Sequence, residues 1–367
     1  MAYTDTPYQN RRYIKESEPF SNVQFKTAVL HNRRIYLGNV KVTYADGVVK
    51  TMSDAILKSE VGNFDKFTSR GIIDVAVGDG ENIIKLESFA DRILEFKDNT
   101  LHIINAAGKA EFLEDSFKYK GVSNPQAVAR TDYGIAWVNS FGCYIYDGRE
   151  VHDILETQNK RKISKTTWAS FITTTSMVGY NPSKRQIIVV DSYLSSASSG
   201  NIFLYDIPTR SWVKGLERVD AGDKSNFVIK NSDNRATSEL VYVKNNSSNC
   251  SIEKWDDTPA VGAVNLSLKD EDFGQPHVRK KIHKVYVTSK NASGISLSAT
   301  PDGNTSNNLS FSSTNLNTGS TWGKTEHKVT ANGNNIYSLQ IKFSGNAGNV
   351  GFEVNDISVI YRTKGIK

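Results

Sequence analysis

The chain has 367 residues, of which 38% are hydrophobic, and its mean hydropathy is −0.43. This length is enough for two ordinary domains with buried cores. The formal net charge is only +6, from 45 basic and 39 acidic residues, so the overall charge does not identify a nucleic-acid-binding protein. No stretch approaches the roughly 18 consecutive apolar residues of a membrane-spanning helix, and the N-terminus lacks a signal-peptide pattern.

The two cysteines, Cys143 and Cys250, lie far apart in the sequence. A small secreted scaffold held together by disulfides would carry more of them. The sequence therefore predicts two reduced thiols and a protein made in a reducing cytoplasm.

Residues 1–21 are polar and charged and follow no clear period, which is typical of a loose terminal arm. Within this arm, Arg11, Arg12 and Tyr13 are candidate interface residues that could anchor it to a neighbouring chain. The alternative for these three residues is an ordinary loose terminus.

Residues 22–265 read as a succession of short strands separated by turns. Aromatic and β-branched residues favour pleated, half-buried surfaces, and Asp46-Gly47 supplies the positive φ that a tight hairpin turn needs. No segment holds a helical period of 3.6 over eleven residues or so. We expect an all-β region with at most one turn of helix near residues 154–164.

A weak repeat runs through the same region. An inner apolar strand is followed by an outer strand that ends in an aromatic residue and a turn, at intervals of roughly 45 to 60 residues. The examples begin at Phe96, Tyr146, Tyr205 and Trp255. Because a lone four-stranded sheet cannot cover its own faces, stacked sheets are favoured, and the spacing predicts a β-propeller of five or six blades. A double sandwich would show similar strands and remains the alternative.

Residues 266–276 are predicted to be a charged linker, and residues 277–367 a small β-sandwich of short alternating strands. The basic run Arg279-Lys280-Lys281 stands at this hinge. It can be a solvated loop or a contact to phosphate groups. We select Arg279, Lys280 and Lys281 as candidate interface residues.

The chain shows no catalytic, cofactor-binding or metal-binding signature. None of the six histidines has metal-ligand spacing with a carboxylate, and there is no Gly-x-Ser-x-Gly nucleophile motif. Three consecutive acids at 270–272 would point to opposite faces of an extended chain, which favours a linker over a Ca²⁺ loop. The prediction is therefore a non-enzymatic protein without a cofactor.

Four aspartates, Asp79, Asp147, Asp206 and Asp256, occur at the expected blade turns. Aspartate is common at turns because its side chain accepts hydrogen bonds from the following backbone amides. The alternative is a glycosidase that uses two of these carboxylates on a propeller. We interpret them as turn residues.

Several stretches resemble the tail-hub, nozzle and stabilisation proteins of short-tailed bacteriophages, marine phages in particular. They are Arg33-Arg-Ile-Tyr-Leu-Gly38, Ser59-Glu-Val-Gly-Asn-Phe-Asp-Lys-Phe67, Gly142-Cys-Tyr-Ile-Tyr-Asp-Gly148 and Phe352-Glu-Val-Asn-Asp-Ile-Ser-Val-Ile-Tyr-Arg362. The resemblance covers most of residues 30–150 and 265–367.

The resemblance implies a structural virion protein, located in the phage tail and synthesised in the host cytoplasm. It implies a ring, commonly of six copies, around the channel through which DNA leaves the capsid. Its partners would be itself and other tail or portal-adaptor proteins, with DNA in the channel. The competing hypotheses are a glycan-binding or glycan-cleaving propeller, and a cytosolic interaction scaffold unrelated to viruses.

Overall fold

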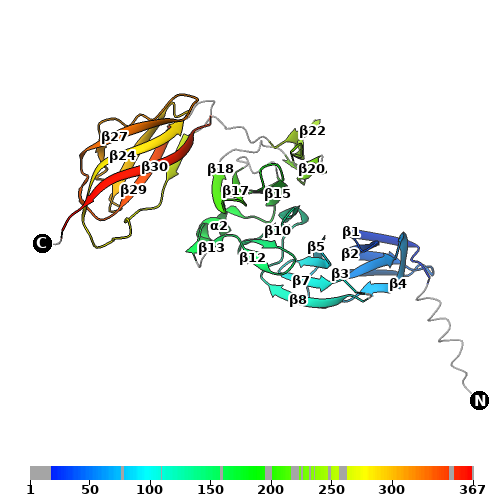
Figure 1. Ribbon diagram of the computed structural model, residues 1–367. Helices are drawn as coiled ribbons and strands as arrows, with labels where there is room; N and C mark the ends of the chain where they lie inside the picture. Colours follow the sequence, from blue (N-terminus) through cyan, green and yellow to red (C-terminus); the bar gives the residue numbers. More distant parts are fainter. Residues whose placement is uncertain are drawn as a thin grey trace, which may run out of the picture. The chain divides into compact units, whose positions relative to one another are not determined.

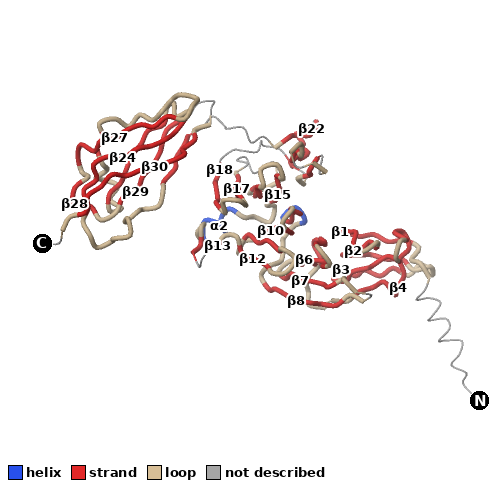
Figure 2. The backbone as a smooth tube through the Cα atoms, viewed as in Figure 1, coloured by secondary structure: helices blue, strands red, loops and turns tan. Residues whose placement is uncertain are grey.

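The computed structural model describes residues 18–75, 78–108, 110–157, 160–194, 201–215, 223–224, 226–230, 233–234, 236–246, 249–255, 263–346 and 351–365. Strands dominate these residues, and the helical segments are short (Figure 2). Contacts between residues divide the chain into two compact units, residues 1–255 and 256–367. The chain is all-β, as the sequence predicts (Figure 1).

Among the described residues, the first unit contains five successive four-stranded antiparallel sheets, which we call blades 1 to 5, and one two-stranded sheet between blades 3 and 4. The strands of blades 1 and 2 are β1 (Asn22–His31), β2 (Arg34–Thr43), β3 (Val49–Glu60), β4 (Asn63–Ile73), β5 (Ile83–Phe89), β6 (Arg92–Lys97), β7 (Thr100–Asn105) and β8 (Phe112–Lys118). Those of blades 3 and 4 are β9 (Val128–Thr131), β10 (Gly134–Val138), β11 (Cys143–Tyr146), β12 (Val151–Asp153), β15 (Met177–Asn181), β16 (Gln186–Val190), β17 (Ile202–Asp206) and β18 (Ser211–Gly215).

Blade 5 is less regular than the other four. Its strands are β19 (Asp223–Lys224), β20 (Val228–Lys230), β21 (Glu239–Asn246) and β22 (Asn249–Lys254). Both β19 and β20 pair with β21, and β22 also pairs with β21. The other blades are simple meanders, in which each strand pairs with the next one in the sequence. This succession of four-stranded sheets is the predicted propeller architecture, with five blades.

Neighbouring blades pack closely through the strands near their shared boundary. The Thr27 hydroxyl of β1 accepts a hydrogen bond of 3.0 Å from the backbone amide of Leu86 in β5. Gly38 of β2 leaves the space that this approach requires, because a Cβ atom there would lie 2.8 Å from Cγ2 of Ile83. Gly38 therefore permits close contact between blades 1 and 2.

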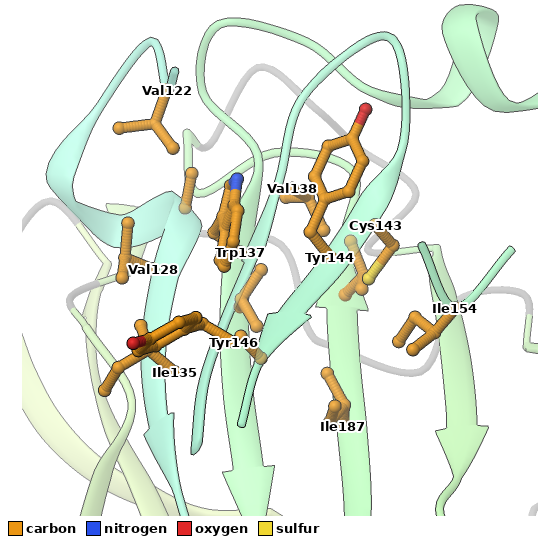
Figure 3. Packing of buried hydrophobic residues seen from close by; sticks show 14 of the residues in the cluster. Val122, Val128, Ile135, Trp137, Val138, Cys143, Tyr144, Tyr146, Ile154 and Ile187 are labelled. Carbon is orange, nitrogen blue, oxygen red and sulfur yellow. The ribbon is translucent and has the colours of Figure 1, made fainter. Parts of the chain in front are cut away.

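The largest apolar cluster spans blades 2 to 4. Figure 3 shows part of it, in which Trp137 and Tyr144 of blade 3 lie close to each other, with Ile187 of blade 4 in the same cluster. The rings of Trp137 and Tyr144 are 5.4 Å apart, and the indole nitrogen of Trp137 donates to the carbonyl oxygen of Lys120. Burying large aromatic rings, with the indole N–H of Trp137 hydrogen-bonded, stabilises the stack of blades.

The short helices lie outside the region where the sequence predicted a helical turn. Residues 154–164 include the small hairpin β13 (Glu156–Thr157) and β14 (Lys160–Arg161). The α-helix α2 (Lys165–Phe171) starts immediately afterwards, and a 3₁₀ helix, η1 (Pro125–Ala127), precedes β9. The sequence therefore placed the helical turn too early in the chain. The helix begins after Ser164 because this residue caps it: the Ser164 hydroxyl accepts a hydrogen bond from the backbone amide of Thr167.

The second unit consists of two antiparallel sheets packed around one apolar cluster. Its strands are β23 (Ala263–Ser267), β24 (Lys280–Lys290), β25 (Ile295–Pro301), β26 (Ser310–Phe311), β27 (Gly323–Ala331), β28 (Asn334–Ile336), β29 (Leu339–Asn346) and β30 (Glu353–Thr363). One sheet has the order β23-β29-β25, while the other pairs β27, β28 and β30 with β24. This is the predicted small β-sandwich.

The sandwich begins earlier than residue 277. Strand β23 pairs with β29, and the backbone amide of Leu268 donates to the carbonyl oxygen of Ile341. Glu271 forms a bridge with Leu339. The acid-rich segment placed in the linker 266–276 thus belongs to the second unit, because its backbone hydrogen-bonds to β29.

Candidate functional site

The predicted interface residues fall into two groups. Arg11, Arg12 and Tyr13 lie outside the described residues. At the start of β24, Arg279 is exposed, Lys281 is half-buried and Lys280 is buried. Lys280 therefore differs from its neighbours, because its side chain is not available to a partner.

Lys280 acts as a clamp inside the second unit. Its ammonium group donates hydrogen bonds to the carbonyl oxygens of Gln275, Val278 and Tyr337, with N···O distances of 2.6, 2.9 and 2.9 Å. The three acceptors match the three donors of an ammonium group. Lys280 thereby joins the turn before β24 to the turn after β28.

A pocket with a volume of about 770 Å³ lies beside this clamp, between the start of β24, β28 and the end of β30. Its walls include three cations, Arg279, Arg362 and Lys364, together with Tyr337 and Asn335. The pairing register explains this convergence. Arg362 stands opposite Lys281, and the backbone amide of Lys364 donates to the Arg279 carbonyl oxygen at 2.8 Å.

Two of the pocket cations donate hydrogen bonds to neutral groups. Arg279 Nε donates to the Tyr337 hydroxyl at 2.9 Å, and Lys364 Nζ donates to Asn335 Oδ1 at 2.6 Å. No carboxylate is found among the described residues that line the pocket. Elsewhere in the second unit cations pair with acids, as Lys284 does with Glu326. The pocket is therefore a region of concentrated positive charge.

Tyr337 is held in place from two sides. Its backbone amide donates to Asp302 Oδ1 at 2.7 Å, and its carbonyl oxygen accepts from Lys280. The residue is 38% exposed and lines the pocket. An aromatic ring that is fixed by its backbone can meet a ligand without losing much conformational freedom on binding.

The described turn aspartates form turns, as interpreted from the sequence. Asp206 accepts hydrogen bonds from both the amide and the hydroxyl of Thr209. Asp147 accepts from the amides of Arg149 and Glu150. Partial burial alone would raise the pKa of Asp147, but these amides and His152 lower it to about 2. Asp256 lies outside the described residues.

Asp79 also takes part in a buried polar cluster between blades 1 and 2. Its carboxylate accepts from the buried Lys97 ammonium group at 2.8 Å, and Lys97 lies 4.0 Å from Glu95. Burial raises the pKa of Glu95 to about 8, although Lys97 opposes this shift. His102 is directly opposite Glu95 across β6 and β7, and burial lowers its pKa. Lys97 thus pairs with the Asp79 carboxylate, while the raised pKa of Glu95 favours the protonated carboxyl group near neutral pH.

Among the described residues, no group of three His, Cys, Asp or Glu side chains is placed to hold a metal ion. His277 precedes β24 and His283 lies within it, so these two histidines do not share a strand. No helix in the described part of the chain is long and apolar enough to cross a membrane.

Exposed apolar side chains gather on strands at the edges of sheets. On β1, Phe25 and Leu30 are 52% and 61% exposed, and on β8, Phe112 and Leu113 are 57% and 45% exposed. Strand β1 pairs with β2 at one edge of blade 1, and β8 pairs with β7 at one edge of blade 2. Edge strands with exposed apolar residues are the surfaces through which chains associate.

Comparison with known proteins gives no family. No family model matches the chain, and no curated protein matches it. Among solved structures, Hsv2 from Kluyvelomyces marxianus matches with 12% identity and a TM-score of 0.33, covering 66% of this chain and 78% of that one. A chain of the mitotic checkpoint complex matches with 13% identity and a TM-score of 0.35, covering 65% and 81%. Similarities this low carry no functional conclusion.

Proposed function

We propose that this chain is a structural protein of a phage tail, which assembles with copies of itself into a ring around the DNA exit channel. The support from sequence is the resemblance of residues 30–150 and 265–367 to tail-hub, nozzle and stabilisation proteins. The support from structure is the set of exposed apolar side chains on edge strands, above all Phe112 and Leu113 on β8. Exposed apolar residues on an edge strand are typical of surfaces through which chains associate.

The proposed partners are other copies of the chain and the tail or portal-adaptor proteins above and below the ring. Association through β8 would remove Phe112 and Leu113 from water. Burying a large apolar side chain contributes about 2 kcal/mol, so a few such residues in each subunit can hold a ring together. No catalytic step is part of this proposal.

The test is the mass of the purified full-length chain in solution, alone and with co-expressed tail proteins. We expect a ring of several subunits, and we expect Phe112→Glu to shift it towards monomer. The control is Val49→Glu, which places the same charge on an exposed side chain of β3, an inner strand of blade 1. A strictly monomeric chain that joins no tail complex would contradict the proposal.

Purified virions give a second and independent test. If the proposal is correct, mass spectrometry of tails separated from capsids will find this chain at a fixed ratio to the portal protein. A chain that occurs only in the infected cell, and not in the particle, would instead support the cytosolic scaffold hypothesis.

A further inference from the structure

We infer that the pocket between β24, β28 and β30 binds an acidic saccharide, that is, a glycan that carries sulfate, phosphate or carboxylate groups. The inference concerns the second unit alone and does not rest on the proposed role in a tail. Three observations carry it: the converging cations, the ordered aromatic ring and the internal clamp that holds both walls.

The first observation is the charge. Arg279, Arg362 and Lys364 come from two neighbouring strand ends, and the register places them together. Residues two apart on a strand share a face, so Lys281 adds a fourth cation next to Arg362 on that side of the sheet. Guanidinium groups bind sulfate, phosphate and carboxylate through paired hydrogen bonds, and an ammonium group adds a compact charge. The ligand is therefore expected to be an anion.

The second observation distinguishes a saccharide from a bare anion. Tyr337 exposes part of its ring in the pocket, and Asn335 and Thr363 add an amide and a hydroxyl. An aromatic ring packs against the apolar face of a sugar, while amide and hydroxyl groups pair with its hydroxyl groups. The volume of about 770 Å³ lies in the range of pockets that enclose small ligands.

The same geometry disfavours nucleic acid. A protein that binds DNA without sequence preference spreads its basic residues along the backbone of the strand, because the affinity comes from many phosphate contacts. Here the cations converge on one concave site at the end of a small sandwich. The convergence fits one or two acidic groups on a short segment of glycan.

The third observation is preorganisation. Lys280 joins the carbonyl oxygens of Gln275 and Val278, which neighbour the lining residues His277 and Arg279 in the sequence, to that of Tyr337. Asp302 fixes Tyr337 and Ser338 through their backbone amides, at 2.7 and 2.8 Å. Lys280 and Asp302 are positioning residues, since they hold the walls and do not line the pocket. A pocket with fixed walls loses little free energy in ordering them when a ligand binds.

The experiment is calorimetric titration of the full-length chain with a chemically defined sulfated tetrasaccharide. The desulfated tetrasaccharide of the same backbone, inorganic sulfate and a single-stranded oligodeoxynucleotide of equal charge serve as comparison ligands. We expect the sulfated tetrasaccharide to bind more tightly than all three, with an affinity that falls as salt increases. Equal binding of the desulfated compound, or tighter binding of the oligonucleotide, would overturn the inference.

Matched variants then locate the site. Arg362→Gln with Lys364→Gln should weaken binding on the order of a hundredfold, about tenfold for each cation. Lys328→Gln with Lys342→Gln removes the same charge from β27 and β29, away from the pocket lining, and should leave the affinity unchanged. Tyr337→Leu should weaken binding of the tetrasaccharide but not of inorganic sulfate. Binding that survives in the Arg362 and Lys364 double variant would show that the site lies elsewhere.

Discussion

The ammonium group of Lys280 donates a hydrogen bond of 2.9 Å to the carbonyl oxygen of Tyr337, which lies 57 residues further along the chain. Lys280 is fully buried, although its neighbour Arg279 is exposed. Lys280, the middle residue of the basic run, therefore stabilises the sandwich, while Arg279, the first residue of the run, lies at the surface of the pocket.

Replacing Lys280 by Met should destabilise the second unit by about 3 kcal/mol. The substitution keeps most of the apolar stem but removes the ammonium donor from three carbonyl oxygens. The Gln275 oxygen keeps the backbone amide of Val278, and each buried group that is left unsatisfied is costly. Chemical denaturation measures the loss, and hydrogen exchange should rise in peptides around residues 275–281 and 334–339. Lys281→Met, at a half-buried position, is the control. Equal stability of the two variants would show that the clamp contributes little.

Glu95 should make stability depend on pH. Its pKa is raised from 4.5 to about 8 in the folded chain, so the folded state holds this proton more tightly than the unfolded state. Its contribution is fully present below pH 4.5 and is lost as pH rises towards about 8. The loss is at most about 5 kcal/mol for a shift of this size.

The measurement is the free energy of unfolding of the wild type and Glu95→Gln across this pH range. The variant carries no titrating proton, so its stability should fall less than that of the wild type as pH rises. The His102 pKa is lowered by burial, which makes its own contribution increase with pH below 6.5 in both proteins. Two parallel pH profiles would mean that Glu95 is already ionised in the folded state.

Gly134→Ala should destabilise the first unit by about 3 kcal/mol. Gly134 has φ of +141°, and a Cβ atom there would collide with the carbonyl oxygen of Tyr146 on the paired strand. Gly108→Ala is the matched control, because its nearest neighbouring atom would lie at 3.7 Å. Thermal unfolding separates the two, and an unchanged transition in Gly134→Ala would refute this account of blade 3.

The two thiols should differ sharply in reactivity. Cys143 is fully buried, and burial raises the pKa of its thiol, whereas Cys250 is exposed. Because the thiolate is the reactive form, a thiol reagent should modify Cys250 in the folded chain and Cys143 only after unfolding. Cys250→Ser should abolish the fast reaction. Rapid modification of Cys143 in that variant would reveal that blade 3 opens readily.

The buried polar cluster shows where sequence patterns fail. Glu95 and Lys97 alternate with Leu94 and Phe96 in β6, which is the pattern of a strand with one wet face. Yet both charged side chains are fully buried, because blade 1 packs on that face of blade 2. Packing between blades involves residues far apart in the sequence, so the alternation of residues within β6 did not reveal that Glu95 and Lys97 are buried.

The sequence by itself determined the local features of this protein. Asp46-Gly47 specified a hairpin, and Gly47 does have a positive φ of +83°. The lack of a helical period and the regular return of aromatic-ended strands specified successive antiparallel sheets, because these signals depend only on neighbouring residues. Tertiary structure alone decided which charged residues are buried and which converge on the pocket of the second unit. Lys280 is a clamp and Arg362 a pocket wall because β24 pairs with β30 in one register, and a register between distant strands is set by the packing of the whole core.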